Sequence, residues 1–305
     1  MKNSSIITLK AREEFVGGAV DAITIGSYGE HDLDAISAHI SRDIICNPKK
    51  WQRKEQEESL NLTFGTAVHF AVLECCENGI FNREKFYSAY AIAPEVNKRT
   101  TAGKEELKAF TTANAGKTIL DRKDFELILA MLESVLRTKS ASAYLGCAEF
   151  VDDVQIFHEV KCSWKYRNIH GDVIPCRARM DTLIINKDAS HVWIGDLKTT
   201  ISAQNESFAK SVVQFGYGWQ AGFYILPFLE LGICADFWAV AVEKTPYADI
   251  GVYNLKDFAN IEIPNIRDFM DNSKEIIQRA KDLKEYRVND DILRAPAWFK
   301  GTKIF

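Results

Sequence analysis

The sequence lacks a long uninterrupted hydrophobic run. Its most apolar stretch, residues 224–242, contains two acidic residues, a proline and a glycine, so we expect a helix end, a turn and a buried strand there rather than a membrane span. The first fifteen residues contain only a short apolar run, which argues against a secretory signal peptide. We therefore expect a soluble, cytoplasmic protein with no membrane partner.

The sequence also lacks paired cysteines and an excess of charge of one sign. Its seven cysteines are an odd number without a Cys-x-x-Cys pair, which is typical of reduced thiols in a cytosol rather than a disulfide scaffold. The 38 Lys and Arg oppose 42 Asp and Glu, for a net charge of −4. This balance argues against non-specific coating of nucleic acid, although it is compatible with a locally basic groove.

The composition, with 47% hydrophobic and 26% charged residues, is that of a globular protein without repeats or low-complexity linkers. We expect a single domain, residues 1–305, with a mostly helical portion up to about residue 150 and a sheet portion from about residue 151. Helical spacing of apolar residues predicts helices at 30–60, 64–77 and within 103–140. Alternation predicts antiparallel strands at 154–166, 174–186 and 191–199, followed by a helix at 204–229, a strand at 234–245 and a helix at 263–287. The pattern indicates an α/β fold.

Three charged residues could meet at one end of this sheet. Asp196 and Lys198 are two apart in one expected strand, and Asp181 lies in the preceding one, so strand alternation lets all three converge if the strands are neighbours. Two carboxylates beside an ammonium group suit a divalent cation held by oxygen ligands, with the lysine near an attacking water. Considered alone, an Asp-x-Lys triplet is more often a surface ion pair.

Two further patterns are weak when each is considered alone. Gly65 and His69 form a Gly-x-x-x-His pattern in an expected helix, where a histidine is usually a core or boundary residue. Gln220 and Tyr224 are four apart and share a helix face, which is more often ordinary packing than a substrate contact.

The order of these motifs in the chain is more specific than any one of them. It resembles the motif series of RecB-like nucleases, a branch of the PD-(D/E)XK superfamily. The segments 94–106, 176–181, 193–200 and 220–224 are more closely similar to RecE-type exonucleases, represented by the C-terminal nuclease domain of exonuclease VIII. The likeness extends from about residue 30 to the tail segment 296–299.

The resemblance implies a restriction-endonuclease-like core, in which helices flank a central mixed sheet. It implies a Mg²⁺- or Mn²⁺-dependent exonuclease that degrades linear double-stranded DNA 5′→3′ and leaves 3′ single-stranded tails. It further implies phage-type recombination in a bacterial host cell, a RecT-like single-strand annealing protein as partner, and a homo-oligomeric ring (trimer or tetramer). The alternatives are a RecB-like nuclease with single-strand or endonuclease preference, and a catalytically inactive module that binds DNA ends.

The resemblance also assigns roles to individual residues. The implied metal ligands are His69, Asp181, Asp196 and the backbone carbonyl of Leu197. Lys198 would orient or activate the water, Glu159 would have a near-site role, and Gln220 and Tyr224 would contact substrate or support the metal ligands. The second acid is an aspartate, as in RecE-type members, rather than the commoner glutamate.

Basic residues are the candidates for DNA contact, because the phosphate backbone requires cations. Arg179 is the strongest of them, since strand alternation places it on the same face as Asp181. The weaker candidates are Lys49, Lys50, Arg53, Lys54, Lys98, Arg99 and Arg177, of which the first four are equally consistent with a solvated helix end. Some RecB-like relatives hold an iron–sulfur cluster with cysteines near the C-terminus. The last cysteine here is Cys234, so we expect no such cluster.

Overall fold

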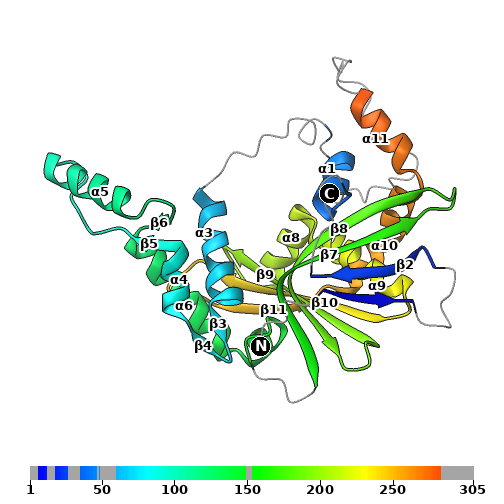
Figure 1. Cartoon of the computed structure of the whole chain (residues 1–305), viewed down its shortest axis with the longest axis horizontal. Helices are drawn as coiled ribbons and strands as arrows, with labels where there is room; N and C mark the ends of the chain where they lie inside the picture. Colours follow the sequence, from blue (N-terminus) through cyan, green and yellow to red (C-terminus); the bar gives the residue numbers. More distant parts are fainter. Residues whose placement is uncertain are drawn as a thin grey trace.

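A mixed seven-stranded sheet forms the centre of the computed structural model, which describes residues 6–11, 18–26, 35–46, 48, 60–148 and 153–282 (Figure 1). In the order of the sheet, the strands are β1 (Ile7–Lys10), β2 (Val20–Ile25), β7 (Val154–Arg167), β8 (Val173–Asn186), β9 (His191–Thr200), β10 (Cys234–Glu243) and β11 (Ile250–Asn254). All neighbours are antiparallel except β9 and β10, which are parallel and joined by a helical crossover.

Helices cover both faces of this sheet, as the α/β prediction with a central mixed sheet requires, and that prediction is confirmed. One hydrophobic cluster joins the sheet to α1 (Ala38–Cys46), α8 (Asn205–Phe215), α9 (Tyr217–Glu230), α10 (Lys256–Asp271) and α11 (Ser273–Asp282). The other joins it to α3 (Leu60–His69), the π-helical turn η3 (Phe70–Glu74), α4 (Arg83–Ala89), α6 (Arg122–Arg137) and α7 (Lys139–Tyr144). In β10, Ala239 and Ala241 enter the first cluster while Val240 and Val242 enter the second, because side chains alternate across a strand.

A projecting region lies beside α3. It contains two small sheets, one of β3 (Cys76–Glu77) with β4 (Ile80–Phe81) and one of β5 (Tyr90–Ile92) with β6 (Thr118–Leu120). The helix α5 (Thr101–Ala113) extends from it, away from the central sheet (Figure 1). None of the helices in the described part of the chain is long and apolar enough to cross a membrane.

The three long strands expected from alternation are all present, and the strand predicted at 234–245 is β10. The expected helical character of the first 150 residues is incomplete, because β1 and β2 pair into the central sheet beside β7. These two strands are short, and their partner lies more than a hundred residues further along the chain, so local periodicity gives little signal for them.

Several predicted helices have different limits. The single helix expected at 204–229 is broken into α8 and α9 at Gly216, whose φ of 69° ends the first helix. The helix expected at 263–287 begins earlier, at Lys256, and is divided between α10 and α11. The helix expected at 64–77 ends in the π-helical turn. Within 30–60, the structure describes residues 35–46, which include α1, residue 48, and residue 60, where α3 begins; residues 30–34, 47 and 49–59 are outside the described residues.

Candidate metal and catalytic site

The candidate site lies where two neighbouring strands separate. β8 and β9 pair only over Thr182–Ile185 and Val192–Gly195. Beyond the last pair, β8 continues alongside β7 and β9 continues alongside β10. Asp181 and Asp196 are the first residues past that pair, so the predicted acids stand on the two sides of the opening. In a continuous sheet, backbone hydrogen bonds would join the two strands here. Because the strands separate, side chains can occupy the space between them.

An irregularity in β7 turns a further acid toward this opening. Glu159 has a positive φ of 47°, which is unusual for a residue with a side chain. On one side of this point, strand residues at even-numbered positions enter the first hydrophobic cluster; on the other side, residues at odd-numbered positions do. The change falls between Val160 and Phe157 in β7 and between Met180 and Leu183 in β8. The change of face at Glu159 and Asp181 therefore brings both carboxylates to the side on which α3 packs.

The third member of the cluster comes from a helix. His69 is the last α-helical residue of α3, directly before the π-helical turn that closes with a hydrogen bond from Cys75 N–H to the Phe70 carbonyl at 2.9 Å. Turns of this kind are frequent at functional sites. The other residue of the Gly-x-x-x-His pattern, Gly65, faces the end of β9, since a Cβ there would lie 3.8 Å from Oγ1 of Thr199.

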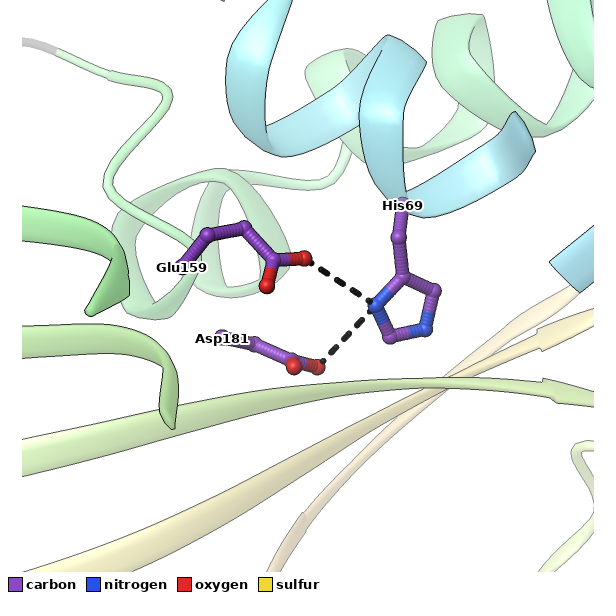
Figure 2. Close-up of side chains that lie close together, drawn as sticks. All are labelled: His69, Glu159 and Asp181. Atoms are coloured by element: carbon purple, nitrogen blue, oxygen red, sulfur yellow. Dashed lines mark ion pairs between the residues drawn. The ribbon is translucent and has the colours of Figure 1, made fainter. Parts of the chain in front are cut away.

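Side chains of His69, Glu159 and Asp181 converge on one point (Figure 2). Nδ1 of His69 lies 3.4 Å from Oδ2 of Asp181 and 3.8 Å from Oε1 of Glu159. One ligand atom from each of the three residues lies within 4.8 Å of the others. The other oxygen of Glu159 forms an ion pair with Nε of Arg179 at 2.6 Å. The backbone N–H of Leu197 donates to Oδ2 of Asp181 at 2.8 Å, which connects the two strands across the opening.

A second group surrounds Lys198. Its Nζ lies 2.6 Å from Oδ2 of Asp196 and donates a hydrogen bond to Oε1 of Gln220 at 3.1 Å. The amide nitrogen of Gln220 donates to the other Asp196 oxygen at 3.0 Å. The ring of Tyr217 faces the ammonium group, with its centroid 4.6 Å from Nζ. The lysine is therefore held on three sides by groups that favour a positive charge.

The charges of these residues depend on one another. Burial would lower the pKa of His69, but the neighbouring carboxylates of Asp181, Glu159 and Asp196 outweigh it and raise that pKa to about 10. Burial would raise the pKa of Asp181, yet His69, Lys198 and the Leu197 N–H lower it. Burial raises the pKa of Asp196 to about 6 against the opposing effect of Lys198.

The arrangement also fits a divalent cation. A neutral imidazole and two carboxylates that point to one centre are donors that such ions take in proteins, and a bound cation would displace the proton that the raised pKa keeps on His69 without metal. Asp196 has a side chain only 3% exposed, and its two oxygens contact Nζ of Lys198 at 2.6 Å and the amide nitrogen of Gln220 at 3.0 Å. Its carboxylate is therefore already satisfied by these two groups. His69, Glu159 and Asp181 could hold the ion, with Asp196 beside it.

The structure separates the predicted site residues into those that meet and those that do not. Seven of them form the two groups just described: His69, Glu159, Arg179, Asp181, Asp196, Lys198 and Gln220. Tyr224 is buried, and its hydroxyl donates to the backbone carbonyl of Arg179 at 2.9 Å, so it braces β8. The described contact of Leu197 is made by its N–H; a role for its carbonyl as a ligand stays a prediction.

The basic candidates are more scattered. Arg177 is half-buried in β8, and its backbone N–H donates to the Ile36 carbonyl at 2.8 Å. Lys98 and Arg99 lie in the exposed turn before α5. Lys49, Lys50, Arg53 and Lys54 lie outside the described residues, as does the tail segment 296–299. No role for the ring of Tyr217 was predicted, although its position one turn before Gln220 was a signal for it.

Residues 46–286, most of the chain, match the family model of the PDDEXK-like domain of unknown function (DUF3799). A crystal structure described as a "Putative exonuclease" from Eubacterium rectale is similar at 15% identity over 84% of each chain, with a TM-score of 0.46. No curated protein matches the chain. The family match confirms the PD-(D/E)XK part of the resemblance and supports a nuclease; the RecE-type assignment stays a prediction. The chain therefore belongs to the PDDEXK-like family that this model describes.

Proposed function

We propose that this protein is a metal-dependent exonuclease that degrades linear double-stranded DNA 5′→3′ and leaves 3′ single-stranded tails for recombination by single-strand annealing. The observation that carries the nuclease part is the convergence of His69, Glu159 and Asp181 beside the Asp196–Lys198 pair where β8 and β9 separate. The RecE-type motif series supports the finer part, the duplex substrate and the 5′→3′ polarity.

Each group has a distinct task in this proposal. His69, Glu159 and Asp181 would hold the ion, and Asp196 would keep Lys198 charged and in place. A bound Mg²⁺ or Mn²⁺ would offset charge on the phosphate and lower the pKa of a water molecule. Nζ of Lys198 has three donors, of which Asp196 and Gln220 take two, so one is left to orient the water or to donate to a phosphate oxygen.

The role of Lys198 follows from its charge. Burial would lower its pKa, but Asp196 and Asp181 outweigh that effect and raise it. A lysine that stays protonated at neutral pH acts as a hydrogen-bond donor and a positive charge, and it does not remove a proton from water. Lys198 is therefore expected to stabilise the negative transition state rather than to serve as the general base.

The DNA would approach along the exposed side of β8. Arg179 has a side chain that is 60% exposed and is directed by Glu159, so its charge is next to the metal group and accessible to a phosphate. A closed ring around the DNA would keep the enzyme on one strand, which fits the trimer or tetramer expected from the resemblance. A RecT-like annealing protein would act on the 3′ tails.

The direct test is degradation of a linear duplex labelled at either the 5′ or the 3′ end, with Mg²⁺, with Mn²⁺ and with a chelator. We expect metal-dependent loss of the 5′-ended strand, no cleavage of closed circular DNA and no activity with the chelator. Preference for single strands or nicking of the circle would support the RecB-like alternative. DNA-end binding without cleavage in either metal would support the inactive module.

A further inference from the structure

A pocket of about 70 Å³ opens next to the candidate catalytic lysine, between α1 and the junction of α8 with α9. Its walls include Lys198, Gln220 and Tyr217 of the candidate site, and the rest comes from groups without a role in the mechanism above, among them Arg42, Asp43 and Phe215. Nε1 of Trp219 donates to the buried Oγ of Ser41 at 2.9 Å and ties α9 to α1, so the two sides of the pocket are held together.

The pocket presents an aromatic surface. Phe215 is 53% exposed, although it is a large apolar side chain at the end of α8. Its ring stacks against Tyr217, with centroids 5.7 Å apart and planes inclined by 29°, and Tyr217 in turn faces Nζ of Lys198 at 4.6 Å. The exposed ring of Phe215 is therefore connected to the candidate catalytic lysine through the ring of Tyr217.

The pocket also contains a cation. NH2 of Arg42 donates to the backbone carbonyl of Gln214 at 3.0 Å, which fixes the guanidinium beside Phe215. Gly216 makes this position accessible, because a Cβ there would lie 2.1 Å from Nε of Arg42. A planar ring next to a fixed guanidinium and an ammonium group combines a stacking surface with partners for a phosphate.

We propose that this pocket is a subsite for an unpaired nucleotide next to the scissile phosphate, with the base stacked on Phe215 and its phosphate near Arg42. The inference rests on the nuclease function proposed above and adds which kind of DNA end the site prefers. A base within a duplex has both faces covered by its neighbours, whereas the base at a frayed end can offer one face to Phe215. The subsite thus favours DNA ends that open by one base pair.

The test compares two linear duplexes that each end in one unpaired 5′ nucleotide, which carries a base in one and is abasic in the other. Stacking on an aromatic ring strengthens base binding in single-strand-binding proteins, so the wild type is expected to degrade the end that carries the base about 10-fold faster. Phe215→Leu, which keeps an apolar side chain but removes the ring, should reduce this ratio to near one. Phe215→Tyr should retain it.

Val213→Ala serves as the matched control, because Val213 is exposed on the same helix and does not line the pocket. It should retain the wild-type ratio. Equal rates of the wild type on both ends would overturn the proposal, and so would a Phe215→Leu variant that keeps the ratio or slows both substrates alike. If Phe215→Leu changes the mass of the protein assembly in solution, Phe215 belongs to an interface between subunits, and the proposal is also overturned.

A binding measurement separates this inference from the nuclease function. An oligonucleotide with 2-aminopurine at its unpaired 5′ end is mixed with the full-length protein in a chelator, where no cleavage is expected. Fluorescence quenching by the wild type that is lost in Phe215→Leu supports the subsite even if no DNA is cleaved in any metal. Equal fluorescence with both proteins refutes the subsite even if cleavage is efficient.

Discussion

Oδ2 of Asp181 lies 3.4 Å from Nδ1 of His69 and accepts a hydrogen bond from the Leu197 backbone N–H at 2.8 Å. This one oxygen atom of β8 connects the next strand, β9, with α3, which ends more than a hundred residues before either strand begins. Its two contacts both favour the charged carboxylate, which explains why the pKa of Asp181 is lowered in spite of burial. The site is therefore organised around an ionised aspartate, as a cation site requires.

His69→Ala should reduce metal-dependent DNA cleavage by more than about 10-fold and raise the Mn²⁺ concentration needed for half-maximal activity. The reason is the loss of one of three converging ligand atoms. Initial rates on a labelled linear duplex, measured over a series of Mn²⁺ concentrations, check this result. His170→Ala is the control, since His170 lies exposed in the turn after β7. If both variants behave like the wild type, His69 has a structural role only.

Lys198→Ala should lower the cleavage rate at saturating DNA by at least ~100-fold while the dissociation constant for DNA in a chelator changes little. The lysine is mostly buried and held by Asp196 and Gln220, so it can contribute little to the initial capture of DNA. Fluorescence anisotropy measures the binding and end-labelled duplex measures the rate. Loss of binding in parallel with cleavage would show that Lys198 is a DNA contact instead.

Much of the catalytic sheet could be predicted from the sequence, because the long strands are buried on one face along most of their length. The alternation in β7 and β8 shows this burial directly, and it placed Arg177, Arg179 and Asp181 together on the less buried face. The pairing of Thr182 with Gly195 then brings Asp181 and Asp196 to the same place along the strands. For these residues, a local pattern and one neighbour relationship were sufficient.

Other parts of the site depend on contacts that a local pattern does not contain. The positive φ of Glu159 is normally marked by glycine or asparagine, and the sequence has neither there. The resemblance implied only a near-site role for Glu159, whereas the structure places it in the cluster with His69 and Asp181. The break at Gly216 did have a signal, a glycine at a helix end, but the apolar pattern on both sides predicted one helix.

The backbone of Glu159 provides a test of strain at the site. Glu159→Gly and Glu159→Ala both remove the carboxylate, but only glycine adopts a φ of 47° without cost. The glycine variant should therefore have the higher free energy of unfolding, by about 1 kcal/mol. Urea denaturation in a chelator measures the difference. Lys161 is an exposed residue of β7 that is not among those with a positive φ. There the alanine variant should be the more stable one, since glycine weakens an ordinary strand. The same order at both positions would refute the strain.

Asp196 should make the metal-free protein less stable as the pH rises from about 5 to 7.5. Its pKa is raised to about 6 in the folded state, mainly by burial, from an ordinary value of 3.8. A raised pKa means that the folded state holds the proton more tightly, so the stabilisation is complete below the unfolded value and is lost as the pH passes through about 6. Asp196→Asn cannot ionise and escapes this loss, of which about 1 kcal/mol falls between pH 5 and 7.5 because the rest is already lost between pH 3.8 and 5.

The quantity to measure is the free energy of unfolding of Asp196→Asn minus that of the wild type, by urea denaturation in a chelator across this pH range. We expect the difference to increase with pH whatever its starting sign. Asp236→Asn is the control on the adjacent strand, because burial there is outweighed by Lys256 and His191, which lower the pKa of Asp236. Its titration then lies below the range, and its difference should stay flat. A flat or falling difference for Asp196→Asn would mean that the buried acid carries no excess cost when ionised, and burial would not raise its pKa.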